Sequence, residues 1–118
     1  MTARDPECIF CRIVAHEIPS TLVYEDGRVT GFRDLNPQAP VHVLLIPNQH
    51  IANTEALEPE HDAVVGAVMR AARTVARQEG VADSGYRLVV NTGRDANNTV
   101  AHVHVHLLGG RGLGWPPG

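Results

Sequence analysis

Histidines alternate with aliphatic residues near the end of the chain, in the run HVHVHLL at residues 102–108. Alternation with a period of two predicts a β-strand that carries His102, His104 and His106 on one face and the aliphatic residues on the other. Along such a strand the Cα atoms of the outer two histidines are about 13 Å apart. A zinc ion needs ring nitrogens at about 2.0–2.1 Å, so three histidines spaced in this way are a poor site for one metal ion, although an adjacent pair fits.

The histidine face has two interpretations. It could be the solvated side of an ordinary half-buried strand, but threonine, lysine or glutamate would solvate that side equally well, whereas imidazole titrates near neutral pH. It could instead be a catalytic face, on which a neutral imidazole attacks phosphorus and a protonated neighbour stabilises phosphate oxygens or protonates a leaving group. We favour the catalytic interpretation, because three histidines in succession are hard to explain by solvation alone.

The rest of the sequence predicts two helices and four further strands. We expect a short amphipathic helix at 8–15, a long helix at 60–79, and strands at 21–25, 28–34, 41–46 and 86–91. The Asp26-Gly27 pair is typical of a tight hairpin turn, while Pro59 and Gly80 fit the first turn and the C-terminal cap of the long helix. Hairpins without repeated βαβ units predict an α+β domain, with a five-stranded antiparallel sheet and both helices packed on one face.

Length and charge limit the classes of protein. The 118 residues predict one domain spanning 1–118, and 43% hydrophobic residues exclude intrinsic disorder. A formal net charge of -3 argues against nucleic acid as a partner. The start of the chain is polar and no apolar run approaches the roughly 20 residues of a membrane span, so we expect a cytoplasmic protein with no membrane partner.

Cys8 and Cys11 are the two cysteines of the chain. Their Cys-x-x-Cys spacing, in a chain without a predicted signal peptide, indicates metal or redox chemistry more than a structural disulfide. One such pair is a weak signal, and zinc ligation, a redox motif and two buried thiols all stay open. A thioredoxin-like motif would also need a preceding strand, which this sequence lacks.

Together with its surroundings, the run at 102–108 resembles the histidine triad motif of the HIT superfamily of nucleotide hydrolases and transferases. The endings Gly109-Gly110-Arg111 and Trp115-Pro116-Pro117-Gly118 resemble its Hint branch. The similarity covers nearly the whole chain, since further segments fall in the family's order and spacing: CIFCRI at 8–13, EIP at 17–19, FRD at 32–34, NPQAP at 36–40 and NTG at 91–93. The resemblance implies a HIT-like fold whose sheet extends across a homodimer.

The resemblance also implies an activity and a set of residues. The activity is hydrolysis of the P–N bond of purine nucleoside 5'-phosphoramidates through a nucleotidyl-histidine intermediate, with release of the nucleoside monophosphate. The implied catalytic residues are His104 as the nucleophile, His106 on the phosphate oxygens, His102 and His42 in support, and Asn91 and Thr99 near the phosphate and leaving group. The implied nucleotide-binding residues are Ile9, Phe10, Ile13, Ile18, Asp34, Leu35, Leu44, Asn91, Thr99, Val100, His104 and His106, with Asp34 on the ribose hydroxyls.

A structural zinc ion held by Cys8, Cys11, His50 and His102 is implied as well, with no organic cofactor. The loop Asn97-Asn98-Thr99-Val100 departs from the Gly-Gln-Ser-Val that the Hint branch usually has, although Thr99 keeps the hydroxyl. Within the superfamily, a diadenosine polyphosphate hydrolase or a nucleotidyl transferase is the alternative. A non-catalytic nucleotide sensor or scaffold and a histidine-rich metal-binding protein are alternatives of other classes.

Overall fold

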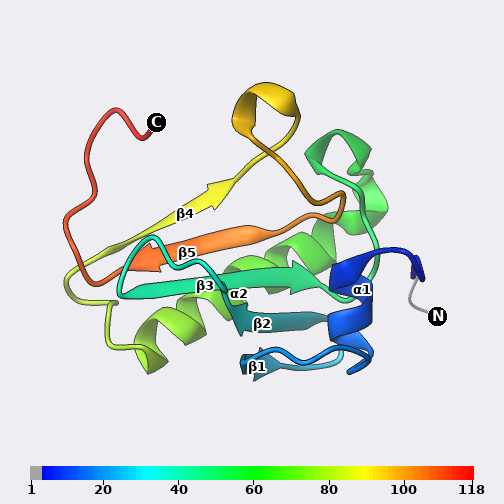
Figure 1. The fold of residues 1–118 in the computed structure, drawn as a ribbon, viewed down its shortest axis with the longest axis horizontal. Coiled ribbons are helices and arrows are strands. Elements are labelled where there is room, and N and C mark those ends of the chain that lie inside the picture. The colour runs from blue at the N-terminus through cyan, green and yellow to red at the C-terminus, as the bar shows by residue number, and fades with distance from the viewer. Residues whose placement is uncertain (1–3) are drawn as a thin grey trace.

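The structure is a computed structural model that describes residues 4–118. Its five strands form one antiparallel sheet in the order β1-β2-β3-β5-β4. The strands are β1 (Leu22–Glu25), β2 (Val29–Arg33), β3 (Val41–Pro47), β4 (Tyr86–Val90) and β5 (Val105–Gly109), and the α-helices are α1 (Ile9–Val14) and α2 (Asp62–Gln78) (Figure 1). The predicted α+β fold, with one short helix, one long helix and five antiparallel strands, is confirmed.

The two helices lie on opposite faces of the sheet. Alanines and valines of α2 pack against Val43 and Leu45 of β3, whereas Phe10 and Ile13 of α1 pack against Leu44 and other residues of the opposite face. Side chains alternate along a strand, so Leu44 points away from the face that α2 covers. In Figure 1, α2 accordingly runs behind the sheet and α1 lies in front of it. The prediction that both helices share one face is wrong for α1, because β3 is apolar on both sides.

Turn and cap residues define the hairpin between β1 and β2 and the end of the long helix. Oδ1 of Asp26 accepts the backbone N–H groups of Arg28 at 2.7 Å and Val29 at 2.8 Å, which closes the turn between β1 and β2. The helix α2 starts later than predicted, because Pro59–His61 forms a separate 3-10 turn ahead of it. At the other end Gly80 follows with a φ of +74°, the left-handed conformation that glycine adopts without strain.

β5 begins at Val105, three residues later than the histidine pattern predicts. The N–H of His102 bonds to the carbonyl of Val100 at 3.0 Å, and the N–H of Val103 bonds to that of Ile51 at 2.7 Å, so this segment does not join the sheet. The ring of His102 is completely buried instead of lying on an open strand face. The prediction that the three histidines share one strand face is therefore wrong for His102 and His104, which both precede β5.

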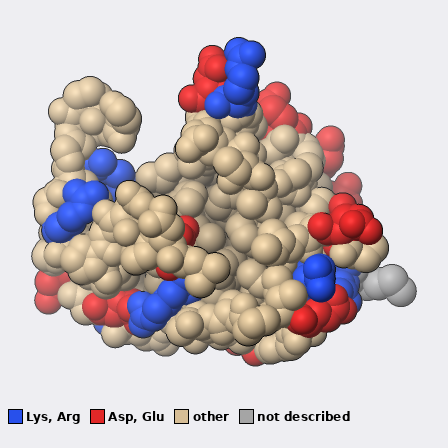
Figure 2. Space-filling view, viewed as in Figure 1, with Lys and Arg blue, Asp and Glu red and all other residues tan. Residues whose placement is uncertain are grey.

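The face of the sheet in front in Figure 1 is largely uncharged. Arginine, aspartate and glutamate side chains gather around its margin, and the C-terminal segment projects from the body as an arm (Figure 2). Among residues 4–118, none of the helices combines the length and the apolar composition that crossing a membrane would require.

Candidate functional site

A cavity of about 280 Å³ opens on the face of the sheet that carries α1. Residues from α1, β2, β3, β5 and the loop before β5 line it, so segments far apart in the sequence meet there. All of the predicted nucleotide-binding residues except Asn91 are in the lining: Ile9, Phe10, Ile13, Ile18, Asp34, Leu35, Leu44, Thr99, Val100, His104 and His106. The lining also includes Pro19, Ser20, Phe32 and Arg33, which the sequence analysis did not single out.

The inner wall of this cavity is apolar and aromatic. The rings of Phe10 and Phe32 pack edge to face with centroids 5.4 Å apart. At the mouth, Leu35 is 98% exposed and Ile9 is 51% exposed, so two large apolar side chains of the lining still face solvent. A flat aromatic ligand entering between them would cover apolar surface that the free protein leaves in water.

His104 lies deep in the cavity with a defined tautomer. Its Nδ1 is 2.7 Å from the main-chain oxygen of His102. A carbonyl oxygen can only accept, so Nδ1 carries the proton and Nε2 is left with its lone pair. The edge-to-face contact with Phe10, at a centroid distance of 5.2 Å, fixes the plane of the ring. His104 therefore presents a nucleophilic nitrogen whose opposite side is already hydrogen-bonded.

A second chain of hydrogen bonds sets the tautomers of His42 and His106. The backbone N–H of Gln38 donates to Nδ1 of His42 at 3.0 Å, so the proton of this imidazole is on Nε2. Nε2 of His42 is 2.9 Å from Nδ1 of His106, and the shared proton therefore leaves His106 protonated on its own Nε2. Oδ2 of Asp34 is 3.5 Å from the same nitrogen of His42. His106 thus offers an N–H beside the lone pair of His104.

The imidazoles of His42 and His106 are neutral near neutral pH. Burial lowers the pKa of His42, although the carboxylate of Asp34 acts in the opposite direction. Burial, with the neighbouring His104 and His42, lowers the pKa of His106 to about 4. We expected a protonated histidine next to the nucleophile, and the structure corrects this: desolvation makes His106 a neutral hydrogen-bond donor.

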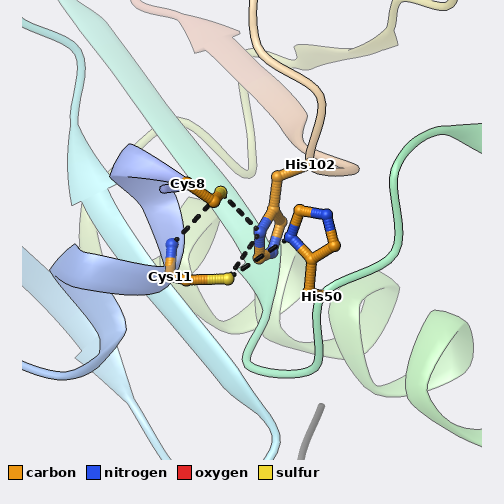
Figure 3. Close-up of side chains that lie close together, drawn as sticks. All are labelled: Cys8, Cys11, His50 and His102. Carbon is orange, nitrogen blue, oxygen red and sulfur yellow. Dashed lines mark hydrogen bonds between the residues drawn. The ribbon is translucent and has the colours of Figure 1, made fainter. Parts of the chain in front are cut away.

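Behind His104, the predicted zinc ligands Cys8, Cys11, His50 and His102 converge (Figure 3). Their ligand atoms all lie within 4.8 Å of one another. Nδ1 of His102 is 3.4 Å from Sγ of Cys8 and 3.6 Å from Sγ of Cys11, and Nδ1 of His50 is 3.3 Å from Sγ of Cys11. Bonds of about 2.3 Å to sulfur and 2.0–2.1 Å to nitrogen place sulfur and nitrogen about 3.6 Å apart in a tetrahedral zinc site, so the spacing fits.

The protonation of this cluster also suits a metal ion. Nε2 of His102 donates to the main-chain oxygen of Pro47 at 2.8 Å, which leaves Nδ1 with a lone pair toward the sulfurs. Burial lowers the pKa of His102 to about 4, so this histidine is neutral. Burial raises the pKa of the Cys11 thiol, although the hydrogen bond from the backbone N–H of Asp5 acts in the opposite direction. A divalent cation would compensate the charge of a buried thiolate.

Thr99 and Asn91, which were both predicted to lie near the phosphate and leaving group, differ in their position relative to the cavity. Thr99 is exposed and lines the cavity. Asn91 directly follows β4, is half-buried, and is absent from the cavity lining in the described chain. The role of the Gln38 backbone could not be predicted from the sequence, since a main-chain N–H leaves no mark in the residue pattern.

Comparisons with known proteins agree with this geometry. The model of the family described as the HIT domain matches residues 15–113. The purine nucleoside phosphoramidase of Escherichia coli strain K12 is 49% identical over 108 residues, which cover 92% of this chain and 91% of that protein. The 14 kDa zinc-binding protein of Zea mays is 48% identical over 116 residues, which cover 97% of this chain and 90% of that protein. The crystal structure of a HIT family hydrolase from Legionella pneumophila superposes with a TM-score of 0.93 at 43% identity, covering 95% of this chain and all of that one.

Proposed function

The chain belongs to the HIT domain family, and we propose that it is a hydrolase that cleaves the P–N bond of purine nucleoside 5'-phosphoramidates. One observation carries the proposal: a lone pair on His104 and an N–H on His106 face one cavity whose inner wall is apolar and aromatic. The name of the Escherichia coli relative supports the substrate class.

The reaction proceeds in two displacements at the α-phosphorus. Nε2 of His104 attacks, an N–P bond to His104 forms, and the P–N bond to the amine breaks as the amine takes up a proton from solvent water. The positive charge that develops on the ring is stabilised by the hydrogen bond from Nδ1 to the carbonyl of His102. Water then attacks phosphorus and loses a proton to solvent, the bond between phosphorus and Nε2 of His104 breaks, and the nucleoside 5'-monophosphate leaves, which restores the lone pair.

The surrounding groups bind the nucleotide and orient it. The Nε2–H of His106 donates to a phosphate oxygen, and the hydroxyl of Thr99 lies at the same cavity for a further contact. Oδ1 of Asp34 accepts the N–H of Asn36 at 2.7 Å, which holds at the cavity a carboxylate that can accept from the two ribose hydroxyls. Ile9 and Leu35 close over the base. Asn91 stays a proposed contact to the leaving group.

A structural zinc ion is also part of the proposal. The support is the convergence of the two thiols and two imidazoles, whose ligand atoms lie within 4.8 Å of one another, together with the name of the Zea mays relative. When bound, the ion would act as a cross-link between α1 and the segment that carries His102. Cys8 and Cys11 would anchor the helix, while His102 would hold the carbonyl that orients His104.

We further propose that the protein is a homodimer. Val65 is 36%, Met69 45% and Val90 44% exposed, and these residues line a small apolar cavity where α2 meets β4. β4 is an edge strand of the sheet, so its free backbone groups can pair with those of a second copy. Exposed apolar side chains next to an open sheet edge are typical of a surface that a partner covers.

The test is to quench the protein during turnover of adenosine 5'-phosphoramidate and to examine its peptides by mass spectrometry. The proposal expects release of the amine and a nucleoside monophosphate adduct on the peptide that carries His104. Tight nucleotide binding with no turnover of phosphoramidates or dinucleotides would favour a sensor or scaffold instead. Faster turnover of diadenosine polyphosphates, or transfer of the nucleotide to a second phosphate compound, would reassign the enzyme within the superfamily.

A further inference from the structure

The guanidinium of Arg111 donates hydrogen bonds to the turn that precedes β3. Its Nε and Nη2 both donate to the main-chain oxygen of Gln38, at 3.1 and 2.9 Å, and Nη1 donates to the main-chain oxygen of Gly112 at 2.9 Å. Arg111 comes two residues after the end of β5. The strand that carries His106 is therefore tied by a side chain to the turn at 36–40.

Gln38, which accepts these hydrogen bonds, also fixes the tautomer of His42. The carbonyl of Gln38 accepts from Arg111, while its N–H donates to Nδ1 of His42 at 3.0 Å. The exit from β5 also packs against this turn, because a Cβ atom added to Gly110 would come within 2.9 Å of the Cβ atom of Pro40. Both peptide groups around the Gln38 Cα atom are thus held, one by Arg111 and one by His42.

The orientation of the Gln38 peptide affects the hydrogen bond between His42 and His106. In the β3–β5 register His42 is opposite Leu108 and Leu44 is opposite His106, so the two histidines are diagonal neighbours on one face. Sheet pairing alone fixes their separation but not the nitrogen that carries the proton. If the Gln38 peptide turned away, Nδ1 of His42 would lose its donor, and only the long 3.5 Å contact of Nε2 with Oδ2 of Asp34 would still favour a proton on Nε2. Nδ1 of His106 would then no longer reliably receive a hydrogen bond.

We propose that Arg111 is a positioning residue for the reaction, acting through the Gln38 main chain to keep His42 an Nε2–H donor and His106 an Nε2–H donor toward the phosphate. This inference rests on the proposed function for its kinetic consequence, but not for its structural one. Arg111 is exposed and is not part of the cavity lining, so its effect passes entirely through the turn.

The test compares Arg111→Met, which keeps the apolar stem and removes every donor, with Arg111→Lys, which restores one donor. Arg28→Met is the control, since Arg28 is an exposed arginine in the β1–β2 turn. For Arg111→Met the proposal expects faster hydrogen exchange at the Gln38 amide, and nitrogen-15 NMR shifts that show mixed protonation of His42. It also expects kcat to fall about 10-fold with KM within about twofold. Arg111→Lys recovers at least half of that loss, and Arg28→Met behaves as the natural protein does.

The outcomes separate this inference from the proposed function. If the natural protein does not hydrolyse phosphoramidates, the proposed function fails, while the exchange and NMR measurements still decide the role of Arg111. Arg111→Met with unchanged Gln38 exchange and an unchanged His42 tautomer overturns the inference, whatever happens to kcat. If Arg111→Met has an altered His42 tautomer but an unchanged kcat, the kinetic part of the inference is overturned. If Arg111→Met does not fold, the same measurements on Arg111→Lys decide: faster Gln38 exchange with a partial fall in kcat supports the inference, and a Gln38 amide as protected as in the natural protein with an unaltered kcat overturns it.

Discussion

His104 donates its Nδ1–H to the main-chain oxygen of His102 at 2.7 Å, while the ring of His102 lies among the thiols of Cys8 and Cys11. His102 thus joins the proposed nucleophile, through its backbone, to the candidate metal cluster, through its side chain. Because the ring of His102 is completely buried and also bonded to Pro47, its carbonyl has little freedom to turn away from His104. The geometry of His104 therefore depends on a residue that does not line the cavity.

Replacing His104 by alanine removes the attacking nitrogen and leaves the apolar wall in place. We expect turnover of adenosine 5'-phosphoramidate to fall by about 10³-fold or more, since no other lone pair in the site is aimed at the phosphorus. Binding of AMP, measured by calorimetry, should stay within a few fold. His16→Ala is the matched control, because His16 is an exposed histidine paired with Glu25 on the surface. Undiminished turnover in the His104 variant would refute the assignment of the nucleophile.

The metal cluster should bind one zinc ion per chain, and the ion should stabilise the fold. Removing it with a chelator frees α1 from His102, so we expect the Tm to fall by several degrees, as a loss of about 1–3 kcal/mol does in a domain of this size. Elemental analysis of the purified protein gives the stoichiometry. The variant Cys11→Ser should lose the ion, whereas His16→Ala should keep it. More than one tightly bound ion per chain would instead favour a general metal-binding protein.

The sequence predicted the elements well because their signals are local: Asp26-Gly27 marks the hairpin, and apolar residues at three- and four-residue spacing mark α2. It put α1 on the wrong face of the sheet and started β5 too early, because both depend on distant partners: Leu44 for the helix and the carbonyl of Ile51 for Val103. The convergence of Cys8 and His50 followed only from a family resemblance, since their spacing in the chain carries no geometric information. The Gln38 amide could not be predicted, because every non-proline residue has one.

Leu35 should contribute to nucleotide affinity and almost nothing to folding. It is 98% exposed in the free protein although it lines the cavity, so a bound base would be the first group to cover it. We expect Leu35→Asn to raise KM about 3- to 10-fold through the lost apolar contact, with kcat unchanged because binding is weakened equally in the ground and transition states. Steady-state kinetics test this, and Tm is the control. A lower Tm with normal KM would place Leu35 in the fold rather than in the site.

The apolar surface around Met69 should hold two copies together. A charge placed there would have to be buried in the interface, so we expect Met69→Glu to shift the protein toward monomer at micromolar concentration. Sedimentation equilibrium measures the change. Thr74→Glu is the control, because Thr74 lies on α2 beside a different groove, next to the β1–β2 turn. A natural protein that is monomeric at high concentration would contradict the proposed dimer.

The buried histidines should make the fold sensitive to acid. The pKa of His106 is held at about 4, below its ordinary value of 6.5, because burial disfavours the charged ring. A depressed histidine pKa contributes stability that is fully present above pH 6.5 and is lost as the pH falls toward 4, since only the unfolded chain takes up the proton in that range. Burial lowers the pKa of His42 as well, so its contribution has the same sign.

For the partly exposed ring of His106 we expect the free energy of unfolding to fall by roughly 1–2 kcal/mol across this range. Urea denaturation of metal-free protein between pH 7 and pH 4 measures the fall without a contribution from metal release. His106→Gln cannot take up the proton and should show a smaller decrease than the natural protein. Equal decreases in the two proteins would mean that the acid sensitivity comes from other groups, and that His106 is as easily protonated in the fold as in the unfolded chain.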